Sequence, residues 1–109
     1  MKLDVTNYSY NIDLGEDTWA KYVVIYTKNY YTNRPPILND FQFRDDTSNW
    51  KTFYPLFVSI SGHNIEFPYQ LSYPSYSYTF KLTGAYFKGH SFRILGENLW
   101  DIEDVELLK

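Results

Sequence analysis

The sequence predicts an all-β protein that folds as one β-sandwich domain of jelly-roll or Greek-key type, with a small closed β-barrel as the alternative. Twelve Tyr, eight Phe and three Trp occur among the 109 residues. Apolar and polar side chains alternate along residues 65–73 and 76–82, as the two faces of a pleated strand require. Short runs of this kind recur about every ten residues, and no window shows the 3.6-residue period of a helix.

The N-terminal part of the chain reads as two or three strands. Alternation at residues 3–5 and 8–14 predicts an opening strand or a strand pair broken near Thr6 and Asn7, and residues 15–17 (GED) predict a turn. Residues 21–28 (KYVVIYTK) are apolar at consecutive positions and rich in β-branched side chains, which is typical of a strand buried on both faces in the middle of a sheet. Residues 29–36 (NYYTNRPP) then form a loop, because the two prolines lack the N–H that a strand donates.

The rest of the chain reads as short strands separated by turns. They are predicted at residues 37–43, 56–61, 65–73, 76–83, 91–95 and 99–108. A polar loop is expected at residues 44–49 and a hairpin turn at residues 61–64. Pro68 predicts that its strand lies at a sheet edge or contains a bulge. The apolar phase shifts by one residue between Ile102 and Val105, which predicts a β-bulge near Glu103 and Asp104.

Composition limits the classes of function. A chain of 109 residues has room for one domain, residues 1–109, and the absence of Cys removes any need for an oxidising compartment. The net charge of −3 comes with no basic stripe, which argues against nucleic-acid binding. The apolar runs are far shorter than a membrane span, and the first residues lack the apolar core of a secretory signal. The expected location is the cytoplasm or a virus particle.

The sequence does not predict an enzyme. Cys is absent, and His63 and His90 fall in predicted turns without a nucleophile motif around them. No carboxylate pair is fixed at the separation that a glycosidase needs. Two His and no Cys do not make a zinc site, and no Asp-x-Asp-x-Asp-Gly loop is present for calcium. We therefore expect no cofactor and no metal.

The surplus of aromatic residues predicts binding. Tyr and Trp carry a large apolar ring with a polar tip at low entropic cost, so rings held on loops over a rigid sheet favour contact with a protein or a sugar. For each ring, the alternative is that it covers the margin of the core. The candidate binding residues lie in predicted loops and strand ends: Tyr30, Tyr31, Arg34, Trp50, Tyr54, Tyr73, Tyr76 and Tyr86.

A second candidate surface is acidic. Five of the thirteen acidic residues occur within residues 97–109. A solvated face of the last strand explains such a run, and a cation site or an acidic docking edge are the alternatives. The residues assigned to this acidic edge are Asp101, Glu103, Asp104 and Glu106.

Residues 92–107 (FRILGENLWDIEDVEL) resemble the end of galactose-binding-like jelly rolls, the sandwich used by many carbohydrate-binding modules. In that family a strand like Phe92-Arg93-Ile94 leads to a final strand with an acidic-acidic-Val-x-Leu pattern, here residues 103–107. The resemblance implies a β-sandwich and carbohydrate as a ligand. In some members the acid before the valine helps to hold a structural calcium ion, a role that would fall to Asp104; the other ligand positions of the family are not found in this sequence.

Two functions from different classes follow. The first is a non-catalytic binding or assembly module, specifically a bacteriophage virion or tail-associated structural protein that assembles with itself or with a protein target. Carbohydrate is the alternative ligand of this module. The second is a small cytoplasmic inhibitor or immunity protein of the anti-defence or antitoxin type, which would block a protein partner through its acidic last strand.

Overall fold

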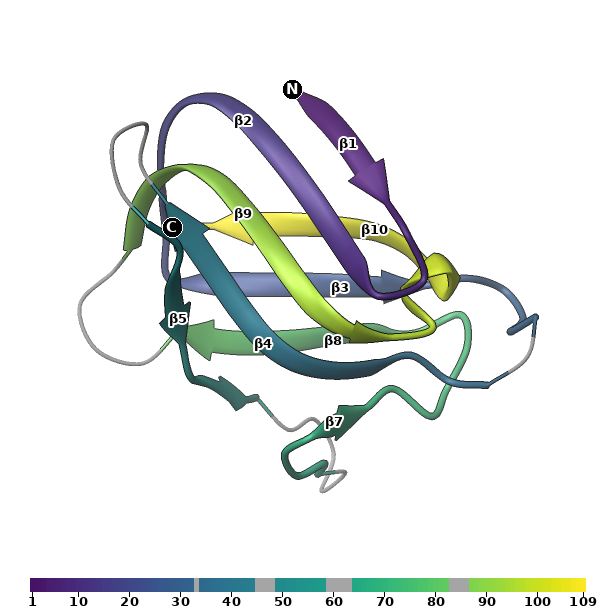
Figure 1. The fold of residues 1–109 in the computed structure, drawn as a ribbon. Coiled ribbons are helices and arrows are strands. Elements are labelled where there is room, and N and C mark those ends of the chain that lie inside the picture. Colours follow the sequence, from purple (N-terminus) through teal and green to yellow (C-terminus); the bar gives the residue numbers. More distant parts are fainter. Residues whose placement is uncertain (33, 45–48, 59–63, 83–86) are drawn as a thin grey trace.

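The computed structural model describes residues 1–32, 34–44, 49–58, 64–82 and 87–109, and these residues form two antiparallel sheets packed face to face (Figure 1). Sheet A has the order β1-β2-β9-β4-β5, with β7 also paired to β4, and sheet B has the order β10-β3-β8-β6. The strands of sheet A are β1 (Lys2–Val5), β2 (Ser9–Ala20), β4 (Ile37–Arg44), β5 (Lys51–Phe53), β7 (Tyr69–Gln70) and β9 (Phe87–Glu97). Those of sheet B are β3 (Tyr22–Thr27), β6 (Pro55–Phe57), β8 (Ser77–Leu82) and β10 (Ile102–Leu108).

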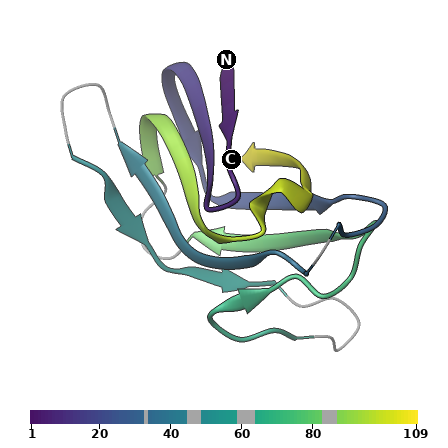
Figure 2. The ribbon, with the colours of Figure 1, turned by 45° about the vertical axis from the view of Figure 1, so that its right-hand side comes forward.

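The prediction of an all-β sandwich is confirmed. No ladder among the described strands joins sheet A to sheet B, so the alternative of a closed barrel is not realised. Strands that are neighbours in space lie far apart in sequence, as β2 with β9 and β3 with β8, because the chain crosses repeatedly from one sheet to the other. This is the connection pattern of a jelly roll. The strands of the two sheets cross obliquely, and Figure 2 shows the same layers turned by 45°.

The core lies between the sheets and is largely aromatic. Phe41 of sheet A contacts Phe80 of sheet B and Phe92 of its own sheet, and all three are at most 1% exposed. The Phe41 and Phe80 rings make an edge contact with centroids 5.3 Å apart, which joins the two sheets directly. The predicted alternation of β8 is confirmed, since Tyr78, Phe80 and Leu82 are buried. The predicted central strand is β3, which has β10 on one side and β8 on the other.

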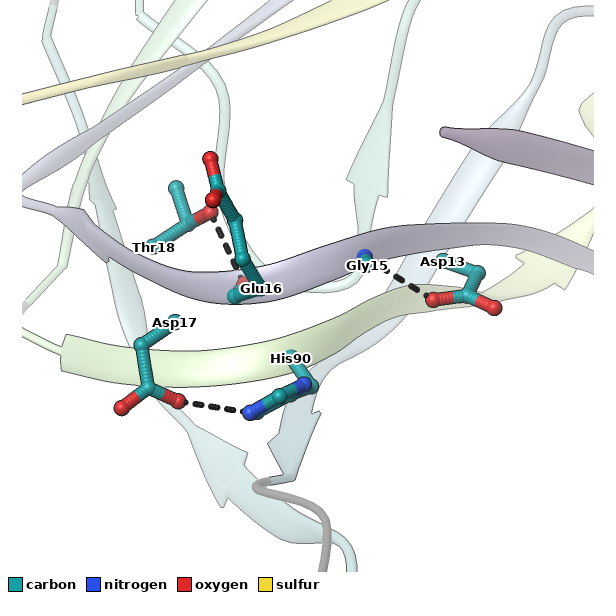
Figure 3. Close-up of polar contacts among 6 residues, drawn as sticks. All are labelled: Asp13, Gly15, Glu16, Asp17, Thr18 and His90. Atoms are coloured by element: carbon teal, nitrogen blue, oxygen red, sulfur yellow. Dashed lines mark hydrogen bonds and ion pairs between the residues drawn. The ribbon is translucent and has the colours of Figure 1, made fainter.

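The predicted turn at residues 15–17 is wrong, because these residues belong to an irregularity inside β2, where residues 14–17 lie opposite His90 alone. The β2–β9 register jumps between Asp13 and Thr18, and His90 of β9 lies opposite the extra residues rather than in a turn. Gly15 has φ +79° and its N–H donates to Asp13 Oδ1 at 3.0 Å. Figure 3 shows Glu16 on one side of the ribbon and Asp17 on the other, where it pairs with His90 Nε2 at 2.9 Å. A glycine permits this local conformation without ending the strand.

Two further predicted strands are reorganised around prolines. Of residues 65–73 only Tyr69 and Gln70 pair, with Leu38 and Ile37 of β4, because Pro68 has no N–H for a ladder. Residues 51–57, where one strand from residue 56 was predicted, contain two short strands, β5 in sheet A and β6 in sheet B. The predicted hairpin turn at residues 61–64 and most of the polar loop at residues 44–49 lie outside the described residues.

The last predicted strand begins later than expected. Residues Leu99–Asp101 form a 3₁₀ turn, η1, and β10 follows. The predicted bulge is confirmed, because the register between β10 and β3 shifts between Ile102 and Asp104. No helix in the described ranges is long and apolar enough to cross a membrane.

Candidate functional site: an aromatic groove

An aromatic groove of about 670 Å³ opens where β6 and the start of β8 face the chain that leads out of β7. The described residues of its lining are mostly aromatic or apolar, and Asn64 and Ser72 add neutral polar side chains. They are Phe57, Asn64, Ile65, Ser72, Tyr73, Pro74, Tyr76 and Tyr78. The groove therefore combines flat apolar faces with hydrogen-bonding groups that carry no charge.

Four rings of the groove form a continuous row. Phe57 contacts Tyr78 with centroids 6.0 Å apart, Tyr78 contacts Tyr76 at 4.9 Å, and Tyr76 contacts Tyr73 at 6.0 Å. The backbone produces this row in two ways. Phe57 lies in β6, which pairs with β8, the strand that carries Tyr78. Tyr76 and Tyr78 are two residues apart, so their side chains point to the same side of the extended chain. Tyr73, at one end of the row, is 56% exposed, whereas Tyr78, between Tyr76 and Phe57, is buried.

The corner at residues 73–76 is held from behind by β3 and by the loop after it. Thr27 Oγ1 donates to the Tyr73 carbonyl at 2.9 Å and accepts from the Tyr76 N–H at 3.0 Å. The Tyr31 hydroxyl lies 2.7 Å from the Tyr73 carbonyl and 2.6 Å from the Leu71 carbonyl. These bonds fix the backbone that presents Tyr73 and Tyr76, so little ordering remains to be done when a ligand binds.

The buried hydroxyl of Tyr78 is a hydrogen-bond donor in the groove lining. The Tyr73 N–H donates to the Tyr78 hydroxyl oxygen at 2.9 Å, and no described residue accepts the Tyr78 proton. Burial is the main reason that the pKa of Tyr78 is raised above its usual value. The hydroxyl therefore keeps its proton at neutral pH and remains a hydrogen-bond donor.

The described lining contains no carboxylate, imidazole, amine or guanidinium. It can therefore stack on a ligand and exchange neutral hydrogen bonds with it, but it has no acid or base for proton transfer near neutral pH. No group of three or more His, Cys, Asp or Glu side chains suited to a metal ion occurs in the part of the chain that the structure describes.

The structure brings together only part of the predicted binding set. Tyr73 and Tyr76 line the groove, and Tyr31 lies behind it with an anchored hydroxyl rather than a displayed one. Tyr30 and Tyr54 are 73% and 72% exposed and do not line the groove.

The remaining predicted binding residues lie elsewhere. Arg34 is exposed and outside the groove lining, whereas Trp50 lies against two arginines of sheet A. Tyr86 lies outside the described residues.

Sequence reasoning missed Thr27, Phe57 and Tyr78 as parts of this site. Tyr78 and Phe57 were assigned to strands, and a strand position gives no indication that it lies at the open end of the sandwich. Thr27 is the last residue of the mostly apolar strand β3. Its role in the site depends on contacts with Tyr73 and Tyr76, which lie 46 and 49 positions away in the sequence. The one available signal was the Tyr-x-x-Tyr-x-Tyr spacing from Tyr73 to Tyr78.

The acidic edge is smaller than predicted. Glu103, Asp104 and Glu106 are exposed on β10, which forms one edge of sheet B. Asp101 instead lies in η1 and is 1% exposed, so its inclusion in the edge is wrong. The 3₁₀ turn directs Asp101 inward, where its carboxylate accepts from Thr32 N and Oγ1 at 3.3–3.4 Å.

Comparisons of the chain with protein-family models, with curated proteins and with solved structures find no match.

Proposed function

We propose that the protein is a non-catalytic binding module that holds a neutral carbohydrate in the aromatic groove. The observation that carries this proposal is the row of four rings, which includes a neutral donor, the Tyr78 hydroxyl. A sugar presents apolar C–H faces that pack on aromatic rings and hydroxyls that need neutral partners. The groove offers both kinds of contact, and the described residues of its lining offer no charge to pair with an ionic ligand.

We further propose that this module is part of a virion or tail of a bacteriophage. Jelly-roll sandwiches serve in viral capsids and in lectins, which supports a virion or tail-associated structural protein that contacts surface carbohydrate. The corner at residues 73–76 is tied to Thr27 and Tyr31 by its backbone, and this corner carries the side chains of Tyr73 and Tyr76 that line the groove.

The test compares two exposed tyrosines. Tyr73→Ala removes the outer ring of the groove, and Tyr54→Ala removes an equally large exposed ring that does not line it. Isothermal titration with a panel of neutral oligosaccharides should find a ligand whose binding weakens by about 1–4 kcal/mol in Tyr73→Ala and is unchanged in Tyr54→Ala. Equal affinity in both variants would place the ligand elsewhere, and no binding by any neutral oligosaccharide would refute the carbohydrate assignment.

A second candidate function, an inhibitor that covers a basic surface of a protein partner, is supported by one observation. Three exposed carboxylates, those of Glu103, Asp104 and Glu106, lie on an edge strand of sheet B. Complementary charge speeds association and selects partners. Replacing the three acids by Lys should abolish co-purification with such a partner, whereas Tyr73→Ala should not change it. If Tyr73→Ala abolishes co-purification and the triple Lys variant does not, the inhibitor function is excluded.

A further inference from the structure

Trp50 contacts two guanidinium groups on the outer face of sheet A, the face that points away from the core. Arg93 Cζ lies 4.1 Å from the centre of a Trp50 ring, and Arg44 Cζ lies 4.7 Å from a ring of the same indole. Both distances fall within the range of a cation–π contact. The two positive charges lie close enough that Arg44 acts electrostatically on Arg93, and they repel.

The register of β4 and β9 explains why these arginines meet. Arg44 pairs with Ser91 and Gln42 pairs with Arg93, so the two arginines are diagonal neighbours on one face of the sheet. Gln42 accepts from Arg93 Nε at 2.6 Å and donates to Thr52 Oγ1 at 3.0 Å. This chain of hydrogen bonds uses one edge of the Arg93 guanidinium and fixes the direction of the others.

The pair lacks a counterion in the described part of the molecule. No described carboxylate lies within ion-pair distance of either guanidinium. Asp13 and Asp40 are diagonal to Arg93 by register, and the Asp13 carboxylate accepts from Gly15. Asp45 and Asp46 lie outside the described residues. Burial lowers the pKa of Arg93, and the neighbouring charge of Arg44 lowers it further.

We propose that Arg44, Arg93 and Trp50 form a binding site for a single oxyanion, a carboxylate or a phosphate group. Apart from Arg93 Nε, the N–H donors of both guanidiniums have no acceptor among the described residues. An oxyanion near the indole accepts from both guanidiniums and relieves their repulsion. The site is independent of the aromatic groove, so either one can fail without affecting the other.

The experiment titrates the protein with inorganic phosphate and, separately, with glucuronate, at constant ionic strength. The Arg Nε–H signals in two-dimensional ¹H–¹⁵N NMR spectra report binding at the guanidiniums themselves. The variants are Arg44→Gln, which removes an exposed side chain without a hydrogen bond to a described residue, and Arg93→Lys, which keeps the charge but loses the fork of donors. Lys81→Gln, which removes one exposed positive charge from sheet B, is the matched control.

The proposal predicts a saturable shift of the Arg93 signal, with the dissociation constant raised about tenfold in Arg44→Gln and unchanged in Lys81→Gln. The probe that binds more tightly identifies the source of the oxyanion. Equal weakening in Arg44→Gln and Lys81→Gln would reduce the effect to net charge and overturn the site. A linear, non-saturating response to both probes would overturn it as well. If Arg93→Lys does not fold, Arg44→Gln decides the outcome alone.

Discussion

Replacing Tyr31 by Phe should destabilise the protein, because the hydroxyl of this residue ties the loop after β3 to the corner that presents the groove. The substitution removes one O–H and keeps the ring, so it opens no large cavity. The two acceptors of the hydroxyl are the carbonyls of Leu71 and Tyr73, at 2.6 and 2.7 Å. The sequence predicted Tyr31 as a displayed binding residue, and the structure makes it a support.

The expected cost follows from those two contacts. A hydroxyl has one proton, so the net loss of its hydrogen bond is about 0.5–1.5 kcal/mol. The Leu71 carbonyl is partly buried at this contact and loses a partner, which adds up to about 1–2 kcal/mol. The free energy of unfolding should therefore fall by about 1–3 kcal/mol. Tyr30→Phe, at the preceding and 73% exposed ring, should change it by less than about 0.5 kcal/mol.

Equilibrium unfolding in urea measures both variants, with the slope against urea used to check that the transition stays two-state. Carbohydrate binding at the groove is the second readout, because a released Tyr73 carbonyl loosens the corner that carries the outer ring. If the free energies of unfolding of Tyr31→Phe and Tyr30→Phe agree within about 0.5 kcal/mol, the Tyr31 hydroxyl does not tie the two segments, and the preorganised groove is refuted.

Four further outcomes are expected. Burial raises the pKa of Tyr31 to about 12, with the nearby Thr27 hydroxyl acting in the opposite direction. The contribution of the protonated Tyr31 to the free energy of unfolding is therefore complete below pH 10 and is lost as the pH rises toward 12. Over that range Tyr31→Phe should lose less stability than the wild type. Gly96→Ala should cost about 3 kcal/mol or more in urea unfolding, because its Cβ would collide with the Ile37 carbonyl oxygen. Asp101→Asn should cost about 1–3 kcal/mol, because the amide turns N–H donors toward the donors of Thr32; a thermal midpoint equal to that of the wild type would contradict this. Excess EDTA should leave the midpoint of thermal unfolding unchanged, and a drop rescued by calcium would reveal a metal site.

Much of the fold could be predicted from local patterns. The alternation that places Tyr78, Phe80 and Leu82 on one face is a property of any extended chain, so it predicted β8 and its buried side correctly. The same reasoning failed at residues 15–17, because a Gly-containing acidic segment fits a turn and a bulge equally well. The difference between them depends on β9, which lies far along the sequence.

The sequence by itself determined that the chain forms a sandwich and that aromatic rings exceed what strand faces alone require. Which rings meet was decided only by the tertiary structure, because ring contacts depend on the register between strands and on the crossing of the sheets. Tyr73 and Tyr76 join Phe57 in one groove, whereas Trp50 joins Arg93 on the other sheet. A pattern of period two assigns a side to each residue, but the long-range pairing of strands assigns its neighbours.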